Sequence, residues 1–188
     1  MNNNCIRNVS YGSTARNMAR VLLTTAVALA AVGIASAQDN TDLKFKGGIG
    51  VIPVTGVAAN GAINLNVVRG VSPGAPWRIA ALEAVVTSDG QIRVVGRGLL
   101  LATGSGIGTN AGQSVHATLF CGPAATATAH SSNVAGVALD ADGDFRIDDF
   151  LSPAPPSSCD SPVLLIRNVG GVWFAAGIPK LEQERDKQ

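Results

Sequence analysis

Residues 81–101, which read ALEAVVTSDGQIRVVGRGLLL, decide the fold. Two apolar-rich runs flank Asp89-Gly90, and both residue types tolerate the positive φ that a type I′ hairpin turn requires. In the second run Ile92 and Val94 alternate with Arg93, and a period of two residues is typical of a strand that buries one face. The stretch therefore predicts an antiparallel β-hairpin.

The alternation of apolar stretches with turn residues continues on both sides of this hairpin. Short apolar stretches from Gly47 to Ile178 are separated by Gly, Pro, Asn and Asp, and none of them has a convincing helical period with caps. Several short strands with turn residues between them favour an all-β sandwich or barrel. We expect an antiparallel β-sandwich over residues 47–178, after a flexible segment at 38–46 and before a charged tail at 179–188.

Two cysteines fall within this domain, Cys121 and Cys159. In an oxidising compartment an even pair predicts a disulfide, so we expect a single domain that is stapled by one bridge. The alternatives are a thiol nucleophile or a metal ligand, but no histidine lies near either cysteine in the sequence. True immunoglobulin domains place a Trp between the bridged cysteines, and none occurs here. The expected architecture is therefore immunoglobulin-like without being a true immunoglobulin domain.

Five aspartates lie within ten residues, and they give the strongest functional signal in the sequence. Their alternating spacing resembles the start of a calcium loop, because Ca²⁺ prefers several oxygen ligands. The match to an EF-hand is incomplete, since Phe145 stands where that loop needs Gly and Leu151 where it needs a bidentate acid. A hairpin with solvated carboxylates is the alternative. The residues predicted to hold calcium, the one cofactor considered, are Asp140, Asp142, Asp144 and Asp148, with Asp149 nearby.

The remaining chemistry-bearing residues are few. His116 is expected to point outward from its strand and His130 to lie in a loop, so both are predicted to be surface residues. Two histidines fall short of the three protein ligands usual at catalytic zinc. Around Ser105, the outer positions of a Gly-x-Ser-x-Gly elbow are occupied by Thr103 and Ile107 rather than by glycine. Trp77, between Pro76 and Arg78, is the candidate ligand contact for a glycan.

The first 37 residues predict a secretory signal peptide. An apolar run from Val21 to Ile34 follows Arg16 and Arg20, and Ala35-Ser36-Ala37 supplies the small residues of a cleavage site. Translation is expected to begin either at Met1 or at Met18. The mature protein would then be secreted or periplasmic.

Cleavage after residue 37 would leave 11 basic and 13 acidic residues, a net charge of −2. This balance predicts neither nucleic acid nor anionic lipid as a partner, and no second apolar segment predicts a membrane span in the mature chain. We expect a monomeric, non-enzymatic binding or structural module whose partner is a protein or a glycan. The alternative is a calcium-stabilised extracellular hydrolase that uses the acidic hairpin Asp140–Asp149.

Overall fold

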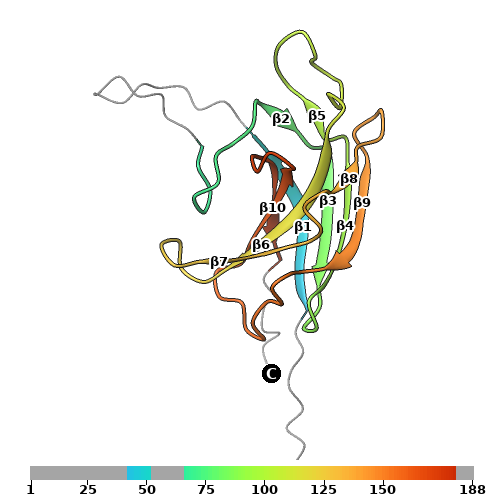
Figure 1. The fold of residues 1–188 in the computed structure, drawn as a ribbon. Helices are drawn as coiled ribbons and strands as arrows, with labels where there is room; N and C mark the ends of the chain where they lie inside the picture. Colours follow the sequence, from blue (N-terminus) through green and yellow to red (C-terminus); the bar gives the residue numbers. More distant parts are fainter. Residues whose placement is uncertain (1–41, 52–65, 181–188) are drawn as a thin grey trace, which may run out of the picture. The chain divides into compact units, whose positions relative to one another are not determined.

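The computed structural model describes residues 42–51 and 66–180, which form eleven strands and no helix (Figure 1). All pairs of strands are antiparallel. The all-β antiparallel fold predicted from the sequence is therefore confirmed. The strands are β1 (Leu43–Gly50), β2 (Trp77–Arg78), β3 (Ala81–Val86), β4 (Gln91–Arg97), β5 (Leu100–Leu101), β6 (Ser114–Cys121), β7 (Thr128–Ser131), β8 (Val137–Ala138), β9 (Phe145–Phe150), β10 (Val163–Asn168) and β11 (Trp173–Pro179).

Nine of these strands make one sheet in the order β7-β6-β10-β11-β1-β3-β4-β9, with β8 paired to the start of β6, while β2 and β5 form a separate small sheet. The large sheet bends until its ends meet. Ser131 in β7 and Ser152 after β9 exchange both backbone hydrogen bonds (3.0 and 2.8 Å), and β8 lies against β9. The result is a nearly closed barrel whose two halves face each other as the layers of a sandwich do (Figure 1).

The core lies inside this curved sheet. Alternate residues of each strand point inward, as the two-residue period requires, and the inward row of β6 runs from Val115 through Ala117 and Leu119 to Cys121. Inward side chains of β3, β4, β9 and β10 join the same cluster. A second, smaller cluster covers the outer side of β10 and β11, where Val71 packs with Leu165 and Trp173.

The β3–β4 and β10–β11 hairpins and the connection from β8 to β9 are closed by the same turn. In β3–β4 the Thr87 N–H donates to the Gln91 carbonyl (3.0 Å) and the Gly90 N–H donates to the Thr87 carbonyl (2.9 Å). The β8–β9 and β10–β11 turns repeat this arrangement with Gly143 and Gly171. Only the glycine of each turn has a positive φ, so the predicted type I′ turn, which needs it at Asp89 as well, is not formed. The loop has three residues, not two.

The start of the domain also differs from the expectation. Residues 38–46 were expected to be flexible, but β1 begins at Leu43, and Phe45 is buried in the core. Leu43 and Phe45 alternate with Lys44 and Lys46, so the strand buries one face and solvates its lysines. The predicted leader at 1–37, its alternative start at Met18, residues 38–41 and the tail from 181 onward lie outside the described residues. In the part of the chain that the structure describes, no helix is long and apolar enough to cross a membrane.

Candidate functional site

The two cysteines form the predicted disulfide. Cys121 and Cys159 are bonded, with their Cα atoms 4.9 Å apart. The bridge ties the end of β6 to the loop before β10, where the Gly122 N–H also donates to the Asp160 carbonyl (2.7 Å). Both sulfurs are consumed in the bridge, so neither cysteine serves as a nucleophile or a metal ligand in this state.

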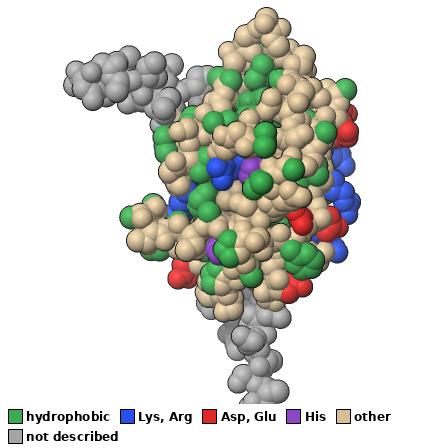
Figure 2. Space-filling model, in the orientation of Figure 1, with side chains coloured by type: hydrophobic (Ala, Val, Ile, Leu, Met, Phe, Trp, Pro, Cys, Tyr) green, Lys and Arg blue, Asp and Glu red, His purple; other side chains and the backbone are tan. Residues whose placement is uncertain are grey.

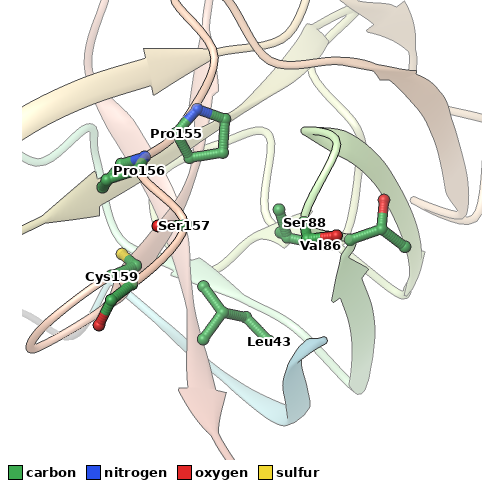
Figure 3. A pocket seen from close by; sticks show the side chains of 9 residues that line it. Leu43, Val86, Ser88, Pro155, Pro156, Ser157 and Cys159 are labelled. Carbon is green, nitrogen blue, oxygen red and sulfur yellow. The ribbon is translucent and has the colours of Figure 1, made fainter. Parts of the chain in front are cut away.

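A hollow of about 280 Å³ lies beside this bridge (Figure 3). Leu43 and Val86 form one wall, and the loop of Pro155, Pro156 and Cys159 forms the other. Its side-chain polar groups are Ser and Thr hydroxyls, and none of the described residues that line it carries an ionisable side chain outside the disulfide.

The turn aspartates serve their own hairpin. Asp140 begins the β8–β9 turn through its backbone, and the Asp142 carboxylate accepts the Asp144 N–H (3.4 Å). The Asp144 carboxylate reaches across to accept the Gly98 N–H (2.9 Å). These are the bonds of a hairpin held against the segment after β4.

The two aspartates of β9 point in different directions. Asp148 lies on the outer face, where it pairs with Arg93 on β4 (3.4 Å). Asp149 turns toward the seam between β9 and β6, where its carboxylate accepts the Asn133 N–H (2.7 Å). Among residues 42–51 and 66–180, no three His, Cys, Asp or Glu side chains lie close enough together to hold a metal ion. The structure therefore does not bring the four predicted calcium ligands together.

Both histidines are buried, which corrects the expectation that they lie on the surface. His130 lies in β7 with both ring nitrogens engaged: Nδ1 lies 2.9 Å from the Pro153 carbonyl and Nε2 2.9 Å from the Thr128 hydroxyl. Since a carbonyl only accepts, Nδ1 is the donor in the first of these contacts. This histidine holds β7 to the loop after β9.

His116 points outward from β6, as predicted, but its outer face is covered and only 3% of the residue is exposed. Among the residues that the structure describes, its Nδ1 has no hydrogen-bond partner, and its neighbour on β10 is Arg167. Burial, together with the positive charge of Arg167, lowers the pKa of the His116 imidazole below its usual value.

Trp77 is also buried, so it is not available as the predicted ligand contact. Its ring stacks on that of Phe174 with centroids 4.2 Å apart and planes 19° apart, and 4% of the residue is exposed. Because flanking residues of mixed polarity say little about tertiary packing, Pro76 and Arg78 gave no sign of this stacking. Trp77 is a core residue at the end of the barrel.

The feature that the sequence did not reveal is a concentration of positive charge on one face of the barrel, here called the cationic face. It is the outer surface of β1, β3, β4 and β9, together with the residue that follows β11. Its six cationic side chains are all exposed. They are Lys44, Lys46, Arg93, Arg97, Arg146 and Lys180. Figure 2 shows Lys and Arg side chains gathered along the edge of the molecule on which β4 and β9 lie in Figure 1.

The strand register explains why these charges meet. Lys44 lies opposite Val85 on β3, and Val85 lies opposite Arg93 on β4. One step along, Lys46 lies opposite Glu83, and Glu83 opposite Val95. Each cation occupies an outward position of its own strand, and the nonlocal order β1-β3-β4-β9 places them side by side.

Two shallow hollows adjoin one another on the cationic face. One, of about 310 Å³, is bordered by Lys44, Lys46 and Lys180; the other, of about 250 Å³, is bordered by Arg97. They share Glu83 and Val95. Together they make an open groove along β3 and β4, and Glu83 lies at its middle.

The charge of this face contrasts with that of the rest of the domain. The six cations are opposed by two acidic side chains, Glu83 and Asp148, which gives a net charge of +4. The other residues after position 37 comprise five basic and eleven acidic ones, a net charge of −6. The signal available in the sequence was the outward position of each cation in a strand pattern. Comparison of the chain with protein-family models, with curated proteins and with solved structures finds no match.

Proposed function

We propose that this chain is a non-enzymatic binding module that works outside the cytoplasm and binds an anionic ligand on its cationic face. One observation carries the proposal: six exposed cations share one open sheet face of a domain whose remaining charge is negative. Single exposed charges contribute little to binding, but a cluster of one sign creates a local potential that attracts and orients an oppositely charged ligand.

The place of action is inferred from two features. The sequence before residue 38 has the pattern of a secretory leader. The Cys121–Cys159 disulfide is of a kind that persists in oxidising compartments. Both features support a periplasmic or extracellular protein.

The non-enzymatic part rests on how the ionisable groups are used. His130 is engaged at both nitrogens, and the carboxylates of Asp144 and Asp149 accept backbone N–H groups. These contacts hold loops and strands in place. No observation favours the alternative of a calcium-stabilised hydrolase, so the binding module is the function we retain.

A binding experiment with anionic polymers tests the proposal. The purified, oxidised chain would be titrated with polyuronate, dextran sulfate and polyphosphate, with neutral dextran as the control polymer. We expect salt-sensitive binding to an anionic polymer, because exposed charges are screened within about 10 Å at 0.1 M salt.

The variant carrying Lys46→Gln, Arg93→Gln and Arg97→Gln should lose most of this binding, whereas Arg78→Gln, at an exposed arginine on β2, should keep it. The absence of binding to every anionic polymer would refute the proposal. Equal loss in the Arg78 control would also refute it.

A further inference from the structure

We infer that the ligand of the cationic face is a linear acidic polysaccharide, with uronate carboxylates at the cations and sugar hydroxyls at Glu83. This inference rests on the proposed function and names its ligand class. It is carried by a second detail of this face: a carboxylate stands in the middle of the basic groove and lines both of its halves.

The cations are spread too widely for one anionic group to contact all of them. In backbone position, Lys44 and Arg93 are two strands apart, about 10 Å, and Arg93 and Arg97 are four residues apart on β4, about 13 Å. Two of these flexible side chains can share one phosphate or carboxylate, but the whole set cannot. A polymer with a charge on successive units meets several of them along the groove.

Glu83 determines what else the ligand must carry. It is exposed and lies opposite Lys46 on β1 and Val95 on β4. An ionised carboxylate only accepts hydrogen bonds, so it favours a ligand with O–H or N–H donors and repels one that presents only anionic oxygens. A uronate chain carries hydroxyl donors beside each carboxylate and satisfies both requirements.

The surface between the charges suits a sugar ring. Val85 and Val95 lie in the groove, and 40% of Val95 is exposed. A sugar ring has an apolar C–H face that packs on such side chains. Sequence-tolerant binding of single-stranded nucleic acid relies on aromatic rings that stack with bases. Of the described residues that line the two hollows, the one aromatic side chain is Phe45, and it is buried.

Calorimetric titration with a six-unit oligogalacturonate tests the inference, and its full methyl ester is the matched ligand without charge. We expect the acid to bind and the ester to bind at least tenfold more weakly. The triple Gln variant should weaken binding of the acid about tenfold, because each exposed ion pair contributes little and three are removed together.

The variant Glu83→Leu separates the ligand classes, because it removes the acceptor and a negative charge at once. We expect it to weaken oligogalacturonate binding about tenfold, the size of a hydrogen bond to a charged group, and to strengthen polyphosphate binding. Arg78→Gln serves as the control, and each variant is first shown to have the wild-type melting temperature.

Three results would overturn the inference, and they differ in what they leave standing. If Glu83→Leu strengthens binding of oligogalacturonate as well as polyphosphate, the hydroxyl contact is refuted while the anion-binding face remains. If anionic phospholipid vesicles or a single-stranded oligonucleotide bind more tightly than the uronate at equal salt, the polysaccharide is refuted and the proposed function survives. If the wild-type chain binds none of these anions, both fail together.

Discussion

Gly143 and Gly171 occupy the same position in two copies of the same turn, yet alanine should have very different effects at the two sites. Their φ angles are +83° and +86°, so the backbone cost of a side chain is the same. Placing alanine in this left-handed region costs about 1–2 kcal/mol, and the lower entropy of the unfolded chain offsets roughly 0.4–1 kcal/mol of it. From conformation alone we expect a loss of about 1 kcal/mol at each position.

The two glycines differ in the atoms that an added Cβ would meet. A Cβ on Gly143 would lie 2.5 Å from the Leu99 carbonyl oxygen and 2.7 Å from the Leu99 nitrogen, both backbone atoms. To make room, the turn must move off this segment and lose the hydrogen bond from the Leu99 N–H to the Gly143 carbonyl (2.9 Å). A buried donor left without a partner costs about 1–3 kcal/mol, and overpacking costs a similar amount. With the conformational cost of about 1 kcal/mol included, Gly143→Ala should therefore destabilise the protein by about 5 kcal/mol in total.

At Gly171 the nearest atom to the added Cβ is Nη2 of Arg167, 3.2 Å away at the end of a flexible side chain. Urea unfolding of both alanine variants, with equal m-values, measures the difference. Asparagine adopts positive φ more readily than alanine, so Gly171→Asn should recover most of the loss and Gly143→Asn should not. Equal destabilisation by Gly143→Ala and Gly171→Ala would refute the argument from close approach.

Three further predictions follow from features described above. Removing the Cys121–Cys159 bridge with paired Cys→Ala changes should lower the free energy of unfolding by about 4 kcal/mol, because the bridge closes a 38-residue loop. An unchanged unfolding midpoint would contradict this. The pKa of His116 is lowered in the folded state, so as the pH falls the unfolded chain binds a proton more readily than the native chain does. The free energy of unfolding should therefore decrease as the pH drops through about 6.5, and it should decrease less in His116→Gln. Identical pH profiles of urea unfolding in the two proteins would disprove this. The melting temperature should be the same in EDTA and in millimolar Ca²⁺. A rise of several degrees in Ca²⁺ that disappears with Asp142→Ala would instead establish a metal site, because a ligand at a hundred times its Kd adds about 2.7 kcal/mol to the free energy of unfolding.

Local pattern was sufficient where strand and turn chemistry decide the outcome. The alternation Val115, Ala117, Leu119 and Cys121 predicted the inward row of β6, and the disulfide follows from placing that row in an oxidising compartment. The hairpin at Asp89-Gly90 was found for the same reason. Its turn type was not, because an Asp-Gly pair fits more than one tight turn and hydrogen bonds between more distant residues select among them.

The burial of His116 and the cationic face depend on contacts between residues that are distant in the sequence. His116 faces outward as the alternation requires, but nothing local reveals that the outer face of β6 is covered. The cationic face depends on β1 lying beside β3, and these strands are separated by more than thirty residues. The net charge of the chain sums the cations of this face with the acidic residues elsewhere, so the cluster does not show in the total. For this reason the small net charge was taken to predict neither nucleic acid nor anionic lipid as a partner.

The pairing of β1 with β11 has a consequence for how the protein is made. The first described strand and the last are neighbours in the middle of the sheet, with Gly48 opposite Gly177. The ribosome must add about 130 residues after Leu43 before this ladder is complete, on the order of ten seconds of synthesis. Until then β1 lacks one of its two neighbours and the barrel cannot close. The β3–β4 hairpin is complete much earlier, so the two halves of the sheet become available at different times, and the last strand to be synthesised is the one that joins them.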